Sequence, residues 1–395
     1  MNVPKLRFKD KDGREFPEWG QSRFGDIATF SKGKGISKAD IAPNGLTPCI
    51  RYGELYNEYN ETIHKIKSRT NINPFHLQLS EANDVIIPAS GETQLDIARA
   101  ACVLSDGVAL GGDLNIIKSS VNGVFLSYYL NHQKKLDIAK LSQGNSVVHL
   151  YSSQLKLLDL IIPSKTEQTK IANFLTAIDE KITQLTQKYH FLVQYKKGVM
   201  QQIFSQKLRF KDEDGMEFPG WEEKGLGDAS VCLDSFRKPL NDAERQAMKG
   251  NIPYWGANNI VDYINNFLFE ETIVLLAEDG GNFNEYQTRP IANISYGKCW
   301  VNNHTHVLKG KAGISNEFLY YSLVHKDITG YVSGGTRSKL TKGEMLKIKI
   351  DIPSTPEQIK IAKLLTAIDD KITHTQTQLD AVKQYKKNLL QQLFV

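Results

Sequence analysis

The sequence predicts a mixed α/β protein in which two globular domains stand in tandem repeat, separated by two long helices that form an antiparallel coiled coil with pseudo-twofold symmetry. Three observations predict this fold class. A short lead-in sequence occurs twice, a long helical segment occurs twice, and the stretches between them share landmarks in the same order. Repeats of this kind indicate the architecture of a protein, so we infer the domain organisation from them before we consider single residues.

The lead-in is the first repeated segment. Residues 5–19 read KLRFKDKDGREFPEW, and residues 207–221 read KLRFKDEDGMEFPGW. Each copy precedes a globular stretch, so the repeat places the domain boundaries. We expect a lead-in at 1–19, a domain at 20–162, a spacer helix at 163–206, the second lead-in at 207–221, a domain at 222–352 and a C-terminal spacer helix at 353–395.

The two globular stretches resemble each other less closely but keep common landmarks. An apolar run precedes Ser90-Gly91 in the first stretch, and another precedes Asp279-Gly280 in the second. The segment FLSYYL from Phe125 corresponds to FLYYSL from Phe318. Short apolar runs bounded by turn residues predict strands. We interpret the two stretches as one shared fold whose loops differ, an arrangement that favours recognition of two different targets.

The repeated helical segment begins at Ser164 and again at Ser354. Ser164 with Glu167, like its counterpart, fits a capping box at a helix start. Apolar residues then alternate at spacings of four and three, which is typical of a coiled-coil seam. Each helix, about 40 residues long, would span roughly 60 Å. The residues expected to pair are Ile171, Leu175, Ile178, Ile182, Leu192, Ile361, Leu365, Ile368, Ile372 and Leu379.

A helix packed only on its own domain is the alternative to helix pairing. The narrow seam occurs in both copies, which favours pairing of the two long helices with each other. Lys196 and Lys386 occupy seam positions. We expect these lysines to reach out at the rim of the pair or to set its register.

Composition limits the class of protein. A formal net charge of +5 and a pI of about 8.7 permit a phosphate-binding surface without requiring one. No apolar run approaches the roughly 20 residues of a membrane span, and the N-terminus has no apolar signal core. The four cysteines form no Cys-x-x-Cys pair. We therefore expect reduced thiols in a cytoplasmic protein that contacts no membrane.

The order of these repeats resembles the specificity subunit of type I restriction–modification enzymes. The resemblance rests on IPSKTEQTKIANFLTAIDEKI from Ile162 and its repeat from Ile352, and on the EFPEW and EFPGW lead-ins. The glycine-bearing turns SQGNS from Ser142 and SGGTR from Ser333 also resemble the family. The resemblance covers essentially the whole chain.

The resemblance implies DNA recognition without catalysis. The globular stretches would be target-recognition domains, each reading one half of a bipartite, asymmetric site in double-stranded DNA, with the helices fixing the unread spacer. Partners would be two methyltransferase subunits carrying S-adenosylmethionine, and restriction–translocase subunits using ATP and Mg²⁺, while this chain holds no cofactor. The alternative is an interaction scaffold, with two binding modules on a coiled-coil spacer and no DNA.

Motifs of a catalytic centre are incomplete throughout the sequence. Asn73-Pro74-Phe75 is one proline short of the motif that holds the target amine in adenine methyltransferases, and it is more typical of a turn. A GxxxxGK[ST] phosphate loop does not occur. The acidic runs at 179–180 and 369–370 fall between seam positions, where charges face solvent or the partner helix. We expect no catalytic residue.

His304 and His306 would lie on one face of a strand, a spacing that zinc tolerates. The matching positions of the first repeat are Asp113 and Asn115, which argues against a shared metal site. We expect no metal and favour DNA contact or a surface strand.

Candidate DNA-reading residues are polar, basic or aromatic side chains at turns between apolar runs. Each has a plain alternative as a turn or core residue. In the first domain they are Lys32, Lys34, Arg51, Tyr52, Ser90, Thr93, Gln94, Asn145 and Ser146. In the second they are Tyr254, Trp255, Asn258, Asn282, Asn284, Thr336, Arg337 and Lys339.

Overall fold

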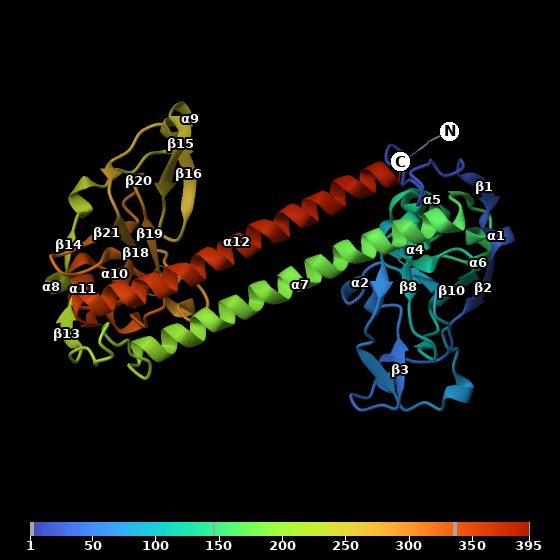
Figure 1. The fold of residues 1–395 in the computed structure, drawn as a ribbon, viewed down its shortest axis with the longest axis horizontal. Helices are drawn as coiled ribbons and strands as arrows, with labels where there is room; N and C mark the ends of the chain where they lie inside the picture. The colour runs from blue at the N-terminus through green and yellow to red at the C-terminus, as the bar shows by residue number, and fades with distance from the viewer. Residues whose placement is uncertain (1–3, 145–146, 335–337, 395) are drawn as a thin grey trace. The chain divides into compact units, whose positions relative to one another are not determined.

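The computed structural model describes residues 4–144, 147–334 and 338–394 of the chain (Figure 1). The chain divides into two compact units. The first comprises residues 1–187 and 377–395, and the second comprises residues 188–376. Each unit therefore contains one globular domain together with part of each long helix.

A five-stranded sheet forms the centre of the first unit, in the order β2-β10-β6-β8-β4. β10 lies between two antiparallel partners, and β6 is buried along its whole length. The β-branched residues of β6 suit a strand that is covered on both faces. α4 (Gly123–His132) packs against β6 and β8. The strands are β2 (Ala28–Lys32), β4 (Thr62–Ile63), β6 (Asp84–Pro88), β8 (Ala101–Val103) and β10 (Leu114–Ser119).

Smaller elements complete the first unit. The sequence Asn73-Pro74-Phe75 begins a single 3-10 turn, in which the Asn73 side chain accepts a hydrogen bond from the backbone of Phe75. The remaining strands are β1 (Gly20–Arg23), β3 (Thr47–Ile50), β5 (Ser68–Thr70), β7 (Ser90–Gly91), β9 (Ala109–Leu110), β11 (Val148–His149) and β12 (Asp159–Ile162). The short helices are α1 (Phe24–Ile27), α2 (Glu54–Asn57), α3 (Gln94–Ile97), α5 (Lys135–Leu141) and α6 (Ser152–Leu155).

The second unit repeats the same centre. Its main sheet has the order β14-β21-β18-β19, so β21 lies between β14 and β18 as β10 lies between β2 and β6. α10 (Asn316–Leu323) packs on β18 as α4 packs on β6. The strands are β14 (Ser230–Cys232), β18 (Ile273–Ala277), β19 (Ala292–Ser295) and β21 (Thr305–Gly310). The predicted mixed α/β class and tandem repeat are confirmed.

A second sheet, in the order β16-β15-β20-β17, also has a counterpart in the first unit, where β3 pairs antiparallel with β5 and parallel with β9 as β15 pairs with β16 and β20. Its strands are β15 (Lys249–Trp255), β16 (Ile260–Ile264), β17 (Phe269–Glu270) and β20 (Lys298–Val301), and β13 (Glu222–Gly225) pairs separately with β22 (Lys349–Ile352). The short helices are α8 (Leu226–Ala229), α9 (Asp242–Ala247) and α11 (Lys342–Lys347).

Two long helices, α7 (Lys165–Phe204) and α12 (Thr355–Leu393), follow the globular domains. In the first unit, the start of α7 packs against the end of α12, through a core that joins Ile171 and Leu175 to Leu389 and Leu393. In the second unit, the start of α12 packs against the end of α7 in the same way, through Ile361, Leu365, Val199 and Ile203. The start of each helix meets the end of the other, so the helices run antiparallel.

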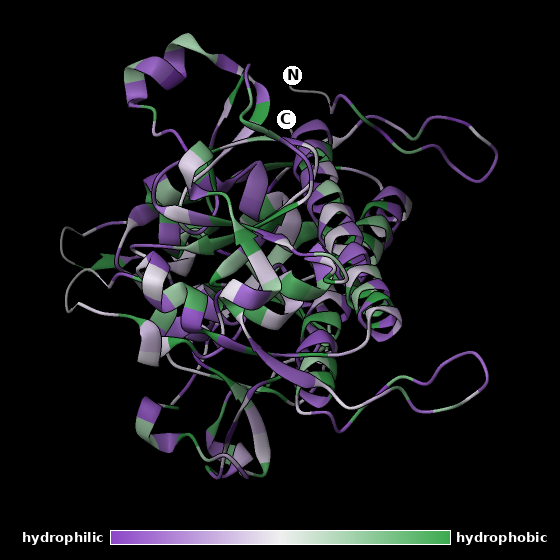
Figure 2. Ribbon diagram, turned by 90° about the vertical axis from the view of Figure 1, so that its left-hand side faces the viewer, coloured by the Kyte–Doolittle hydropathy of each residue, from purple (hydrophilic) through white to green (hydrophobic). Residues whose placement is uncertain are grey.

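The seam near each domain is shared between the partner helix and the domain's own core. Ile171 and Leu175 are buried with Phe125 and Leu160 of the first domain, so pairing and packing on the domain occur together. Of the other predicted seam residues, Ile178, Ile368 and Leu379 are buried, and Ile182, Leu192 and Ile372 are half-buried. In Figure 2, hydrophobic and hydrophilic residues alternate along the turns of the long helices.

Each lead-in is anchored to the start of the helix that follows its domain. Arg7 makes a bidentate ion pair with Glu167, with nitrogen–oxygen distances of 2.7 and 3.2 Å. Arg209 makes the same pair with Glu357, with the same two distances. Both carboxylates are fully buried. Neither expected capping box is therefore complete: the first is half formed, and in the second the Ser354 hydroxyl has no hydrogen-bond partner among the described residues. The Ser164 hydroxyl accepts a hydrogen bond from the backbone of Glu167, but the carboxylate points to an arginine 160 residues away.

No helix within the described residues is both long enough and apolar enough to cross a membrane. The four cysteines are free, and Cys49, Cys102 and Cys299 are buried. Burial raises the pKa of Cys49 to about 11 and that of Cys102 to about 12, so these thiols stay protonated and unreactive at neutral pH.

Candidate nucleic-acid interface

One end of the central sheet gathers the loops that differ between the repeats. In the first unit, β6 ends there and β10 begins there, because the two strands are antiparallel. Residues 143–144 and 147–149, which pair with each other and are here called the first hairpin, join this end through pairing of β11 with β7. In the second unit, residues 333–334 and 338–339 pair in the same way and are here called the second hairpin, which joins the end of β18 through a bridge between Lys339 and Asp279.

The stems of the two hairpins are closed by the same hydrogen bonds. Gln143 and His149 exchange backbone bonds of 2.9 and 2.7 Å, and Ser333 and Lys339 exchange bonds of the same lengths. Each first stem is followed by a glycine with positive φ, +126° at Gly144 and +97° at Gly334. Glycine adopts these angles without the steric cost that a side chain brings, so it suits both positions.

A pair of polar side chains stands beside each hairpin at matching positions. In the first unit, the Ser90 hydroxyl lies 3.1 Å from the Asp113 carboxylate. In the second unit, the Asp279 carboxylate lies 2.7 Å from Nδ1 of His304. The position that carries an acid in one repeat therefore carries a potential base in the other, while the contact itself persists. The two units therefore present different hydrogen-bond donors and acceptors at the same positions of a shared fold.

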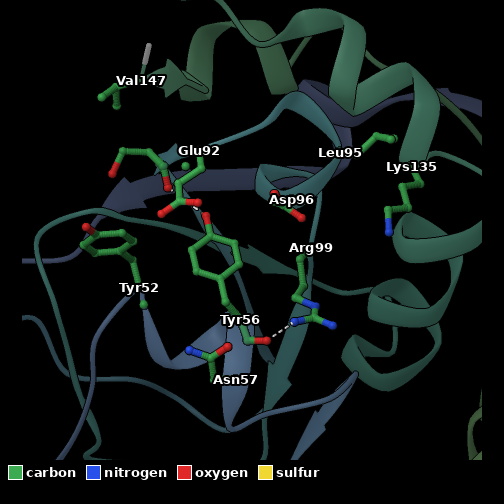
Figure 3. Close-up of a pocket in the computed structure, with 12 residues that line it drawn as sticks. Tyr52, Tyr56, Asn57, Glu92, Leu95, Asp96, Arg99, Lys135 and Val147 are labelled. Atoms are coloured by element: carbon green, nitrogen blue, oxygen red, sulfur yellow. Dashed lines mark hydrogen bonds between the residues drawn. The ribbon is translucent and has the colours of Figure 1, made fainter.

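A hollow of about 680 Å³ opens beside the first hairpin, next to Val147 (Figure 3). Tyr52 and Tyr56 face into it, and Glu92 and Arg99 line it with Lys135. The hydroxyl of Tyr56 donates to the carbonyl oxygen of Ser90 at 2.8 Å, and burial raises the pKa of this phenol, which keeps it a donor.

The chemistry of this hollow suits nucleobases. Aromatic rings offer surfaces on which a base can stack, and carboxylates accept hydrogen bonds from the exocyclic amino groups of cytosine and adenine. Arg99 is held rigidly because its guanidinium donates to the backbone carbonyls of Leu55 and Tyr56, at 2.8 and 2.7 Å. Tyr52 and Glu92 remain exposed and available.

Basic and aromatic side chains also lie beside the first hairpin. The Lys32 ammonium group lies 5.7 Å from the centre of the Tyr151 ring, and this ring stacks on His149. Lys34 is exposed two residues further on. Ammonium groups on an exposed edge are suited to phosphate contacts.

The corresponding surface of the second unit is built from three loops. The side-chain amide of Asn258 donates to the carbonyl oxygen of Gly280 at 2.9 Å, and the backbone amide of Gly280 donates to the carbonyl oxygen of Ser338. Lys339 reaches back to Glu278 at 3.2 Å. Loops that are far apart in the sequence are thereby joined into one surface at the end of β18.

Three of the predicted DNA-reading residues are buried and correct the sequence analysis. Tyr254 is 2% exposed, and its hydroxyl accepts a hydrogen bond from the backbone of Leu240. Asn282 donates to the carbonyl oxygen of Pro290, and Ser90 is bound to Asp113. These three side chains support the surface and do not form it, because a buried polar group is already paired.

The other candidates differ in how freely they face solvent. Arg51 is half-buried and pairs with Glu54 at 3.5 Å, and the indole of Trp255 donates to Ser295. The exposed candidates are Lys32, Lys34, Tyr52, Thr93, Gln94, Asn284 and Lys339. Asn145, Ser146, Thr336 and Arg337 lie outside the described residues.

Several residues of this surface escaped the sequence analysis. Tyr56, Arg99 and Lys135 line the hollow, and His149 with Tyr151 flanks the first hairpin. A signal for Tyr56 exists in the sequence, since Tyr52, Tyr56 and Tyr59 crowd a short polar segment. Lys135 carries no such signal, because only the fold brings α5 to this place.

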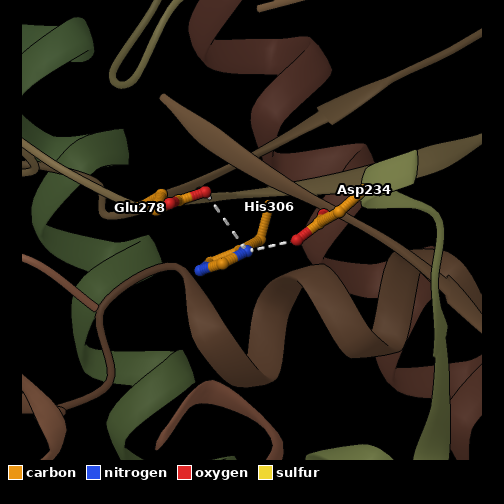
Figure 4. A group of neighbouring side chains, drawn as sticks. All are labelled: Asp234, Glu278 and His306. Atoms are coloured by element: carbon orange, nitrogen blue, oxygen red, sulfur yellow. Dashed lines mark hydrogen bonds and ion pairs between the residues drawn. The ribbon is translucent and has the colours of Figure 1, made fainter. Parts of the chain in front are cut away.

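Asp234, Glu278 and His306 form the one group within the described residues that has metal-ligand chemistry and spacing (Figure 4). Their surroundings do not suit a cation. Arg237 lies 2.7 Å from Glu278 and 3.3 Å from Asp234, so a guanidinium already pairs with both carboxylates. Both nitrogens of His306 are engaged, with Asp234 at 2.7 Å and the carbonyl oxygen of Leu340 at 2.8 Å. The group is an internal hydrogen-bond network.

Comparisons with known proteins agree on one family. The family model described as "Type I restriction modification DNA specificity domain" matches residues 17–190 and 219–384. A putative type I restriction enzyme specificity subunit of Haemophilus influenzae is 40% identical over 147 residues, which is 37% of each chain. The MjaVIII specificity subunit of Methanocaldococcus jannaschii is 22% identical over 97% of this chain and 94% of its own.

A solved structure shares the fold. The crystal structure of the type I restriction–modification S subunit from M. genitalium superposes with a TM-score of 0.68 at 19% identity, covering 100% of this chain and 99% of that one. The match extends over both units and both long helices.

Proposed function

Because this chain belongs to the family of type I restriction–modification DNA specificity proteins, we propose that each of its units reads one half of a bipartite, asymmetric site in double-stranded DNA. The chain itself is a non-catalytic specificity subunit. The first half is read by residues 20–162 and the second by residues 222–352, with the lead-ins at 1–19 and 207–221 as anchors.

The observation that carries this proposal is the contrast between matched supports and unmatched surfaces. The Arg7–Glu167 and Arg209–Glu357 pairs have the same distances in the two units, and so do the stems of the two hairpins. The side chains presented at the end of the sheet differ. Two domains that recognise the same base sequence would have the same recognition surface. Two domains that recognise the different halves of an asymmetric site need different surfaces.

The spacer helices and the partners complete the proposal. The antiparallel helices at 163–206 and 353–395 keep the number of unread base pairs constant, since a helix pair is stiff over its length. Two methyltransferase subunits carrying S-adenosylmethionine bind this chain, and restriction–translocase subunits that use ATP and Mg²⁺ join them in the cytoplasm. Because the lead-ins and long helices are alike in the two units, they provide two similar binding sites for two copies of the methyltransferase subunit.

Genome-wide mapping of methylated adenine tests the proposal directly. Cells with and without this gene are compared while the methyltransferase partner is kept in both. A motif of two short defined halves around an unread gap should be lost with the gene. Exchange of residues 20–162 for those of a relative should then change one half and leave the other. If no motif disappears while the partner is active, the chain does not direct methylation, and the interaction scaffold becomes the better description.

A further inference from the structure

In each unit, one buried polar side chain of the central strand contacts the backbone of the residue that follows the hairpin. In the first unit, the amide nitrogen of Asn115 donates to the carbonyl oxygen of Leu150 at 2.9 Å. In the second unit, Nε2 of His306 lies 2.8 Å from the carbonyl oxygen of Leu340. Asn115 is 0% exposed and His306 is 1% exposed. The leucine in each case directly follows the second stem of the hairpin.

The two contacts occupy the same place in the fold. Asn115 stands opposite Ile87 in the pairing of β10 with β6, and His306 stands opposite Leu276 in the pairing of β21 with β18. In both repeats these are the second residue of the middle strand and the second-to-last residue of its neighbour.

The leucine backbones confirm the match. The amide of Leu150 donates to the carbonyl oxygen of Ala89 at 3.0 Å, and the amide of Leu340 donates to that of Glu278 at 2.7 Å. Ala89 and Glu278 each directly follow the central strand that neighbours β10 or β21. The side chain at this position contacts the leucine carbonyl oxygen in both units, although it is an amide in the first unit and an imidazole in the second.

Each donor is oriented by a second contact. The side-chain oxygen of Asn115 accepts a hydrogen bond from Ser152 at 2.9 Å. Nδ1 of His306 faces Asp234 at 2.7 Å, and Asp234 in turn accepts from the backbone of Val307 at 2.9 Å. Since a carbonyl oxygen only accepts, the proton of the Leu340 contact sits on Nε2.

These contacts matter more for the hairpins than for the cores. The hairpin stems hold themselves with two backbone bonds each and contribute one buried residue, Val148, to the apolar core of the first unit. A buried carbonyl that loses its donor is costly. Without the donor, the leucine and the stem beside it lose one of the bonds that hold them against the sheet.

We propose that Asn115 and His306 are positioning residues for DNA reading: each sets the hairpin of its own unit against the central sheet and thereby fixes which bases that unit accepts. The inference rests on the proposed function. It predicts that damage at either residue is confined to one half of the DNA site.

The test uses His306→Leu, which removes the donor at similar volume, and His306→Asn, which supplies the donor of the first unit in its place. Asn115→Leu is the matched variant on the other side. Methylated adenine is mapped genome-wide for each variant in the full complex, and thermal unfolding is followed in parallel. His306→Leu should admit additional bases in one half of the motif only, Asn115→Leu in the other half only, and His306→Asn should restore discrimination.

A local measurement keeps the inference testable if His306→Leu methylates nothing. Hydrogen exchange of the Ser333 and Lys339 amides in the purified complex should accelerate about tenfold or more in this variant, because the cost of an unpaired buried carbonyl is of that order. The amides of β18 should keep their rate, and His306→Asn should return the hairpin rate to within a few-fold of the unmodified protein.

The failure of this inference differs from the failure of the proposed function. If the unmodified chain directs no bipartite methylation, the proposed function fails. If it does, and His306→Leu leaves both halves unchanged or relaxes both equally, the inference is overturned. Equal acceleration of the hairpin and β18 amides that His306→Asn does not reverse would also overturn it, because the residue would then serve the whole domain.

Discussion

The ammonium group of Lys196 lies 2.6 Å from the carboxylate of Asp369, across the pair of long helices in the second unit. The same contact recurs in the first unit between Lys386 and Asp179, also at 2.6 Å. Each lysine also lies over a tyrosine ring of the adjoining domain, Tyr321 or Tyr128, whose hydroxyl donates to the same aspartate. One lysine thus links the partner helix to the domain, a role beyond the rim position or register that the seam pattern indicated.

Loss of one such lysine should weaken its unit. Lys196→Met keeps the apolar stem and removes the charge, leaving Asp369 half-buried with Tyr321 alone. We expect a loss of about 1–3 kcal/mol in the free energy of unfolding. A double-mutant cycle with Asp369→Asn, followed by chemical denaturation, measures the coupling. Additive effects of the two substitutions would show that the contact contributes nothing, and Lys386→Met provides the matched comparison.

The two lead-in anchors should differ in strength although their ion pairs match. The indole of Trp221 also donates to Glu357 at 3.2 Å, whereas the indole nitrogen of Trp19 has no hydrogen-bond partner in the described part of the chain. Glu167 therefore depends more heavily on its arginine. We expect Arg7→Gln to lower the free energy of unfolding by about 3 kcal/mol and Arg209→Gln by less. Denaturant titration checks the order, and an equal or inverted effect would contradict it.

Gly33 should tolerate no side chain. A Cβ atom there would lie 1.9 Å from the carbonyl oxygen of Gly111, and that oxygen belongs to backbone that cannot swing away. We expect Gly33→Ala to cost about 3 kcal/mol or more. Gly53→Ala is the matched control in the same unit, since nothing lies within 4 Å of its Cβ position. Melting temperatures of the two variants provide the comparison, and similar values would refute the steric argument.

The carboxyl group of Glu61 should make the first unit sensitive to acid. Burial raises its pKa, but His132, at 3.8 Å, and the charge of Lys386 outweigh burial and lower the pKa to about 2. A depressed pKa contributes stability that is present above the ordinary value of 4.5 and is lost as the pH falls toward 2. The difference in unfolding free energy between the unmodified chain and Glu61→Gln should therefore shrink between about pH 5 and pH 2. A constant difference across this range would contradict the assignment.

Lys32 and Lys34 should contribute to DNA affinity without contributing to sequence choice, given the proposed function. Replacement of both by alanine should weaken binding to specific and unrelated DNA alike. The slope of log affinity against log salt should fall by about 0.9 for each phosphate contact that is lost. Lys118→Ala, at the opposite end of the same pair of strands, is the control. A change in the methylated motif would instead assign these lysines to base reading.

The repeat and the periodicity of the helices were sufficient to predict the fold class. A seam such as Ile171 to Ile178 records which face of a helix is covered, and two copies of it in one chain imply that they pair. The deep burial of Ile171 and Leu175 also depends on the domain core, however. The periodicity alone does not distinguish a partner helix from a domain surface, because both exclude water in the same way.

The site was less predictable than the fold. Tyr52 and Lys32, which were chosen as aromatic or basic residues at turns between apolar runs, are exposed. Tyr254 follows the same pattern in sequence but is buried, since it packs in a cluster with Leu240, Ile264 and Trp300. A turn-like sequence does not reveal whether another layer will cover it.

By itself, the sequence determined the two repeats, their helices and the family, because these depend on local periodicity and on similarity that is written along the chain. The tertiary structure alone decided which polar groups meet. Glu167 pairs with Arg7, and His306 with Leu340, across separations of 160 and 34 residues. Such contacts arise because a buried polar group must find a partner wherever packing places one, and only the packed structure shows where that is.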